Sequence, residues 1–290
     1  MSESSRCLLR AATRRADRGD SGAALWLPDF LRARASLMTV SVFSVVLGIA
    51  AAGASGLVGS FALMKRMTLA GDVVSHLALP GLGLAFLWHL NPLYGAAVTL
   101  AIGIVLIDQL QRRTGFTSET AIGVIFVAAL AIGTLVTPTE DLIDALFGGL
   151  EQVTAGGFIA GMTGCAVVLG TLFILRHKLI TIIFSPDLAA SLGINVRRVN
   201  FVYLCAFGLT ILLGLRSLGS LLVGAMIIVP AAAGRRLAKT LDQFLIASSV
   251  TSIAAVGLGF AIALRWNLTP GPTIVGVGSA IFALTLLRRG

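Results

Sequence analysis

The sequence predicts an all-α, polytopic membrane helix bundle with about eight or nine transmembrane helices. Hydrophobic residues make up 57% of the 290 residues and charged residues only 12%, whereas soluble domains average about 25% charged residues. The apolar residues come in continuous blocks rather than periodic stripes, so they do not build a larger soluble core. The 33 glycines are typical of membrane helices that pack closely through small side chains.

Nine apolar blocks approach the length of about 20 residues that a helix needs to cross the hydrocarbon layer. In chain order they cover residues 38–63, 68–89, 92–111, 118–137, 154–175, 199–215, 218–236, 240–264 and 272–287. Several are short or rich in glycine, so the number of full crossings is eight or nine. Residues 38–290 are predicted to form one transmembrane domain. Residues 1–37 are an Arg-rich leader that is expected to be flexible or to lie in the membrane interface.

The positive charges indicate the orientation of the bundle in the membrane. Thirteen Lys and Arg residues lie in one set of connections, and only Arg216 and Arg265 lie in the alternate set, so the first set should face the cytoplasm. Nine crossings would place the N-terminus outside, whereas the seven arginines of the leader favour the inside, and the sequence leaves both open. These topology signals account for the net charge of +9. With no nucleic-acid-binding motif, the sequence predicts no nucleic-acid partner.

The connection of residues 137–154 is predicted to face outward. It carries four carboxylates and no cation: Glu140, Asp141, Asp144 and Glu151. An acidic outer mouth would concentrate cations. An amphipathic surface turn is the alternative.

The second block contains the run GDVVSHLALPGLGLAF at residues 71–86. Asp72 and His76 are four residues apart, so they lie on one face of a helix. A carboxylate and an imidazole in this arrangement suit Zn²⁺ or Mn²⁺. Because Asp72 facing lipid would cost several kcal/mol, we expect it to face a cavity, a pore or a partner. A polar pair that joins two helices and a proton relay are the alternatives.

Two prolines inside the blocks predict irregular helices. Pro80 follows the Asp72/His76 pair by four residues, and Pro230 lies in the block of residues 218–236. Proline removes a helical hydrogen bond, so a kink or break is expected at each position.

The cytoplasmic stretch of residues 184–200 predicts a short helix. Ser185 or Pro186 can begin it, Asp187 suits its positive end, and Gly193 can end it. A capped helix between two spans indicates a docking element for a cytoplasmic protein, and a helix lying on the membrane is the alternative.

Together these stretches resemble the permease family of zinc/manganese ABC importers. Its GD-x-x-SH-x-x-LPG motif is matched by Gly71, Asp72, Ser75, His76, Leu79, Pro80 and Gly81. Its cytoplasmic motif is matched over Pro186–Arg197, although the family's Asp-Pro order is reversed to Ser185-Pro186-Asp187. The runs of residues 119–126, 146–148 and 218–233 also fit. The resemblance covers residues 38–287.

The resemblance implies a homodimeric permease whose partners are a cytoplasmic ABC ATPase and an extracytoplasmic metal-binding protein. It implies that Asp72 and His76 contact a passing Zn²⁺ or Mn²⁺, with no permanently bound cofactor. It also implies a contact to the ATPase made by Pro186, Asp187, Leu188, Ala189, Gly193 and Arg197. The chain has no Walker-type phosphate loop, so it is expected not to be an enzyme itself.

Two other functions stay open at this point. One is an ion-coupled secondary carrier that uses Asp72 and His76 as a proton relay. The other is an ABC permease for an iron chelate, although two Tyr and three Trp are few for an aromatic-lined path. The sequence does not decide between Zn²⁺ and Mn²⁺, because Asp and His serve both ions.

Overall fold

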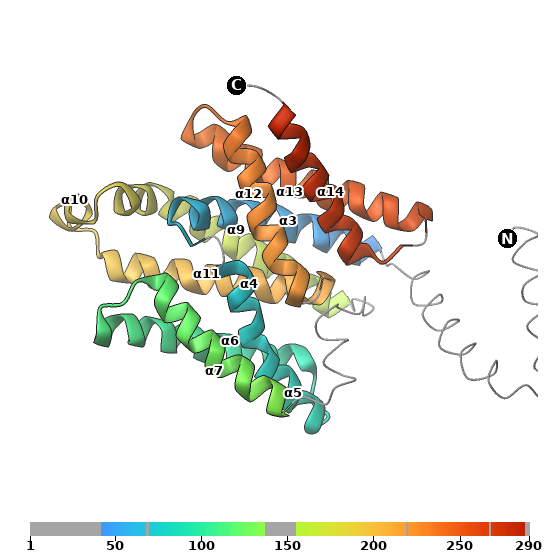
Figure 1. Cartoon of the computed structure of the whole chain (residues 1–290), viewed down its shortest axis with the longest axis horizontal. Helices are drawn as coiled ribbons and strands as arrows, with labels where there is room; N and C mark the ends of the chain where they lie inside the picture. Colours follow the sequence, from blue (N-terminus) through green and yellow to red (C-terminus); the bar gives the residue numbers. More distant parts are fainter. Residues whose placement is uncertain (1–41, 68–69, 137–154, 219, 267, 288–290) are drawn as a thin grey trace, which may run out of the picture. The chain divides into compact units, whose positions relative to one another are not determined.

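The computed structural model describes residues 42–67, 70–136, 155–218, 220–266 and 268–287, and every regular element in these ranges is a helix (Figure 1). Eight of the described helical segments are long and apolar enough to cross a membrane. The predicted helical membrane bundle is therefore confirmed. The leader of residues 1–37 and the acidic connection with Glu140, Asp141, Asp144 and Glu151 lie outside the described residues.

The described helices follow the predicted blocks. The second block is divided among α4, the 3-10 turn η1 and α5, and the cytoplasmic stretch forms α10. In chain order the elements are α3 (Val42–Met64), α4 (Ala70–Ser75), η1 (His76–Ala78), α5 (Leu79–Leu87), α6 (Pro92–Thr114), α7 (Ser118–Val136), α9 (Ala155–Phe184), α10 (Pro186–Ser191), α11 (Val196–Leu218), α12 (Ser220–Leu237), α13 (Leu241–Trp266) and α14 (Pro270–Leu287).

Helix α9 departs most from its predicted block of residues 154–175. It continues to Phe184 and has 30 residues, which corresponds to a length of about 45 Å. The hydrocarbon layer is only about 30 Å thick, so an upright α9 would extend about 15 Å beyond it. The charged residues from Arg176 to Lys178 were interpreted as the end of the helix, but they end only its apolar part.

The centre of the fold is α3, which packs against α9, α11, α12 and α13. Ala54, Val58 and Phe61 on α3 are fully buried. In α3 and in the second span, 67% of the most apolar 18-residue stretch is buried, whereas in α7 only 17% of the corresponding stretch is buried. The second span is therefore an inner element of the bundle, while most of α7 faces lipid or another chain.

Helix α12 continues through Pro230, so of the kink or break expected there, a break does not occur. Pro230 has no N–H to donate to the carbonyl of Met226. The hydroxyl of Ser55 on α3 lies 3.5 Å from that carbonyl oxygen, and Thr251 on α13 donates to the carbonyl of Pro230 at 3.0 Å. Hydroxyls from neighbouring helices thus meet the polar groups around the proline, as membrane helices require.

A buried lysine joins the end of α3 to the beginning of α11. Lys65 directly follows α3, and its Nζ donates to Oδ1 of Asn200 at 2.5 Å and lies 4.7 Å from the centre of the Tyr203 ring. The Tyr203 hydroxyl in turn donates to the carbonyl of Val58 at 3.2 Å. Because the partners of Lys65 are neutral, burial lowers the pKa of this lysine from 10.5 to about 8. The contact also places the C-terminal end of α3 and the N-terminal end of α11 on the same side of the membrane.

We expect Lys65→Met to remove a pH dependence of stability. Between pH 8 and 10.5 the folded chain binds fewer protons than the unfolded chain, so the free energy of unfolding of the wild type rises with pH in this range. Below pH 8 the cost of burying the charge is present in full. The variant should melt several degrees higher than the wild type near neutral pH, and the difference in melting temperature should close as the pH rises. Thermal unfolding in detergent across this range measures the effect.

Lys178→Met on the exposed end of α9 is the matched control and should leave the pH dependence of the wild type in place. Equal pH profiles for wild type and Lys65→Met would contradict the expected cost of burial.

Candidate functional site

The second span breaks at the turn that carries His76. Helix α4 ends at Ser75, and the 3-10 turn η1 (His76–Ala78) connects it to α5. Pro80 is the second residue of α5 and cannot donate to the carbonyl of His76 four residues earlier. That carbonyl instead accepts the N–H of Leu79, so the backbone tightens to a 3-10 pattern. The interruption thus lies directly beside the Asp72/His76 pair.

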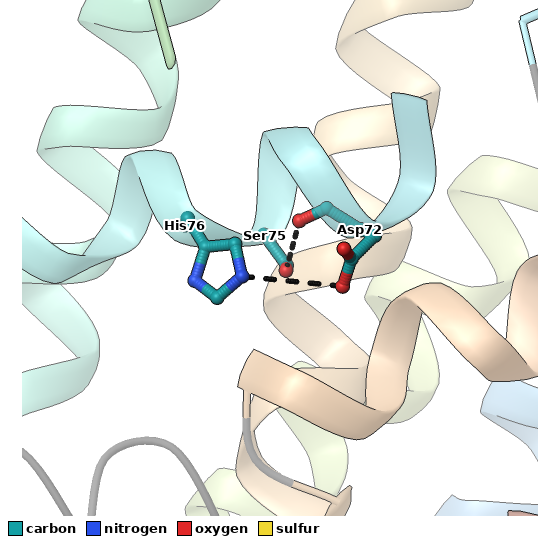
Figure 2. Close-up of polar contacts among 3 residues, drawn as sticks. All are labelled: Asp72, Ser75 and His76. Atoms are coloured by element: carbon teal, nitrogen blue, oxygen red, sulfur yellow. Dashed lines mark hydrogen bonds and ion pairs between the residues drawn. The ribbon is translucent and has the colours of Figure 1, made fainter. Parts of the chain in front are cut away.

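Asp72 and His76 face each other across the break, as Figure 2 shows. His76 Nε2 lies 3.9 Å from Asp72 Oδ1, which is too long for a hydrogen bond. The His76 side chain is 13% exposed and that of Asp72 is 49% exposed. The carboxylate is therefore not sealed between neighbouring helices of this chain. In a membrane such a group needs an aqueous path or a partner chain.

Two glycines bring α4 against α12 and thereby place the pair. A Cβ at Gly224 on α12 would lie 2.5 Å from the Cα of Asp72 and 2.6 Å from its backbone nitrogen. A Cβ at Gly71 would lie 3.4 Å from the Cα of Gly224. The backbones of the two helices are thus in direct contact at Asp72. Ser75 fixes the same turn, since its hydroxyl donates to the carbonyl of Asp72 at 2.6 Å.

The pair can supply two ligands to one divalent ion. Two ligand atoms, each about 2.1 Å from a zinc ion at a tetrahedral angle, lie about 3.4 Å apart. The separation of 3.9 Å is close to this value and leaves a gap that an ion can fill after a small side-chain rotation. No group of three or more His, Cys, Asp or Glu residues that could hold a metal occurs in the described parts of the chain. The pair alone could therefore supply only two of the four ligands that a tetrahedral zinc site requires.

The predicted short cytoplasmic helix is present as α10. Ser185 caps it by accepting the N–H of Leu188 at 3.2 Å, and Pro186 occupies its first turn. The reversed order Ser185-Pro186-Asp187 therefore still gives a capped helix. Beyond its end, Gly193 has a φ of 74°, and the N–H of Ile194 bonds back to the carbonyl of Ala189 at 3.0 Å. This left-handed turn requires glycine and directs the chain into α11.

The predicted residues thus form two separate groups. Asp72, His76 and Pro80 meet at the broken span, and the residues of α10 lie at the far end of the α9–α11 hairpin (Figure 1). Helix α11 contacts both α10 and α4, so one helix connects the two groups. Sequence reasoning missed Gly224 and Phe126, which both contact the pair. The small residues of α12 were the available signal for Gly224.

The eight apolar helices and the broken inner span define a polytopic helical membrane protein. The chain belongs to the ABC 3 transport family, whose sequence profile matches residues 36–289. It is accordingly an ABC transporter permease and a multi-pass protein of the cytoplasmic membrane, as the resemblance predicted.

Individual relatives match this chain over most of their own length. The chain is 28% identical to the high-affinity zinc uptake system membrane protein ZnuB of Haemophilus influenzae, over 80% of this chain and 90% of that protein. It is 31% identical to the manganese import system permease protein ScaB of Streptococcus parasanguinis, over 86% and 88%. The structure of PsaBC from Streptococcus pneumoniae in complex with Fab matches with a TM-score of 0.73 and 26% identity, over 89% of this chain and 95% of that chain.

We expect Gly224→Ala to displace α4 from α12. Replacing a helical glycine with alanine normally stabilises a helix by about 0.5–1 kcal/mol, but the new methyl group would overlap the backbone of Asp72. Overpacking of this kind costs about 1–3 kcal/mol. The variant should therefore be destabilised, and it should lose transport activity. The melting temperature in detergent and uptake into vesicles measure the two effects.

Gly257→Ala on α13 is the matched control, because a Cβ there meets nothing within 4 Å. If Gly224→Ala were as stable and as active as Gly257→Ala, the close approach of α4 to α12 would not position the pair.

Proposed function

We propose that this chain is the membrane-spanning subunit of an ATP-driven importer of a divalent transition metal, Zn²⁺ or Mn²⁺. The observation that carries the proposal is the Asp72/His76 pair, whose Nε2 and Oδ1 atoms lie 3.9 Å apart beside the break of an inner span. Membership in the ABC 3 transport family favours this function over a stand-alone ion-coupled carrier. Zinc and manganese are the ions in the names of ZnuB and ScaB.

The geometry of the pair supports a passing ion rather than a resident one. Two ligands from one chain are too few for a tight site, and Asp72 is half exposed. A second copy of the chain, related by a two-fold axis, would bring the number of ligands to four. The site then receives the ion from an extracytoplasmic binding protein and releases it on the other side. Release requires binding that is not too strong.

Helix α10 is the proposed contact to a cytoplasmic ATPase. Three apolar side chains on and beside it are strongly exposed, Phe184 at 77%, Leu188 at 53% and Leu192 at 65%. Helix α9 has 30 residues and is longer than the hydrocarbon layer is thick, so we place these side chains in the aqueous layer. Clustered apolar side chains in an aqueous layer are typical of a protein interface. The same surface includes the N-terminal turn of α10 with Asp187 and the beginning of α11 with Arg197.

The proposed coupling runs through α11. Closure of the ATPase would push α10, and α11 contacts both α10 and α4. Helices α4 and α12 touch through Gly71 and Gly224. A movement of α11 would therefore change the position of Asp72 relative to the rest of the bundle. Alternating access to the pair follows from this movement, and ATP is hydrolysed by the partner subunit.

We expect Asp72→Ala and His76→Ala each to abolish ATP-dependent metal uptake while leaving membrane insertion intact. Each substitution removes one of the two ligands in the chain, and the loss of a ligand lowers transport by more than about tenfold. Uptake of Zn²⁺ and of Mn²⁺ into vesicles that contain the chain, its ATPase and its binding protein measures the effect and identifies the ion.

His89→Ala and Asp242→Ala are controls of the same chemistry, because both residues are exposed at helix ends. Normal uptake by both Asp72→Ala and His76→Ala would refute the proposed site. Uptake that continues when ATP hydrolysis is blocked would instead indicate a carrier.

We expect Leu188→Asp to uncouple the permease from its ATPase. A carboxylate placed in an apolar interface opposes docking, so co-purification of the ATPase and metal-stimulated ATP hydrolysis should fall by about tenfold or more. The matched control is Leu237→Asp at the end of α12, a residue that is 39% exposed and lies on the same predicted side of the membrane. Equal recovery of the ATPase with both variants would exclude α10 as the docking element.

A further inference from the structure

The imidazole of His76 rests against a phenylalanine from another helix. The ring of Phe126 on α7 has its centroid 5.7 Å from that of His76, with 47° between the ring planes. Helix α7 is held close to the broken span, because a Cβ at Gly133 would lie only 3.0 Å from the Cβ of Leu79. Phe126 therefore lies against the imidazole, and this contact accounts in part for the low exposure of the His76 side chain, 13%.

The two nitrogens of His76 have different surroundings. Nε2 points toward Asp72, as Figure 2 shows, at 3.9 Å from Oδ1. Nδ1 is buried and has no hydrogen-bond partner among the described residues. A metal-binding histidine is usually oriented by a hydrogen bond from its second nitrogen to a carboxylate or a carbonyl. In the described part of this chain, packing is the remaining means of fixing the orientation of the ring.

We propose that Phe126 is a positioning residue that directs Nε2 of His76 toward Asp72 and the gap between them. The inference rests on the proposed function, since it concerns the same pair. An imidazole without this neighbour would rotate about its side-chain bonds, and its nitrogen would leave the line to Asp72. Positioning groups of this kind commonly change metal affinity or activity by about 10–100-fold. Phe126 itself has no atom that binds a metal, so it acts only through His76.

The test separates positioning from folding. Phe126→Ala and Phe126→Leu are assembled with the ATPase, and uptake into vesicles is measured against the concentration of metal-loaded binding protein. Phe126→Ala should lower the maximal uptake per assembled complex by about tenfold and leave the half-saturating concentration of the binding protein unchanged. Phe126→Leu fills most of the same space and should stay within about twofold of the wild type. Val127→Ala, on the exposed face of α7, is the control.

A second measurement reads the histidine directly. The visible absorption of Co²⁺ bound to the purified permease reports nitrogen coordination, and Phe126→Ala should weaken this signal while Val127→Ala should not. If Phe126→Ala fails to assemble, Phe126→Val makes a smaller cavity, and the same two measurements apply to it.

Three outcomes would overturn the inference. One is a maximal uptake of Phe126→Ala equal to that of the wild type. Another is a loss of uptake that only matches a loss of assembled complex. The third is an unchanged Co²⁺ signal. Asp72→Ala and His76→Ala are measured in the same vesicles. If they transport normally, the proposed function fails, whereas if they are inactive and Phe126→Ala is normal, only the positioning role fails.

Discussion

The direct backbone contact between α4 and α12 is the constraint on which the geometry of the site depends. Gly224 leaves no side chain between the helices, so the backbone of Asp72 lies against α12. Helix α12 in turn packs on α3 at the centre of the bundle, where a Cβ at Gly59 would lie 2.0 Å from the carbonyl oxygen of Ile227. The position of one carboxylate is thus tied to the core of the fold through two contacts that only glycine allows.

The two prolines show why a sequence pattern alone does not predict a break. Both remove one helical hydrogen bond. At Pro80 the freed carbonyl of His76 is taken by the N–H of Leu79, and the helix changes to a 3-10 turn. At Pro230 a serine hydroxyl from α3 lies near the freed carbonyl of Met226, and α12 continues. The groups that surround the freed carbonyl thus differ at the two prolines, and at Pro230 they include a residue that is distant in the sequence.

Much of the fold could be predicted from the sequence, because lipid requires long apolar helices and their blocks are visible in the chain. The Asp72/His76 spacing and the caps of α10 were also readable, since they are local. Phe126 and Gly224 were not, because their roles depend on which helices pack together. The length of α9 was underestimated for a related reason. Charged residues end an apolar block, but they do not end a helix that continues into water.

The bare Nδ1 of His76 has a consequence for how long a cargo ion stays. In permanently occupied zinc sites, the histidine nitrogen that does not bind the metal usually donates a hydrogen bond. Loss of this hydrogen bond weakens metal binding by about 10–100-fold. At the proposed site, Nδ1 of His76 has no such hydrogen bond among the described residues. With arrival rates unchanged, a dication would leave such a ligand faster by the same factor. If the proposed site carries the ion, the ion would stay only briefly, and helix movement rather than release of the ion would limit the rate of the transport cycle.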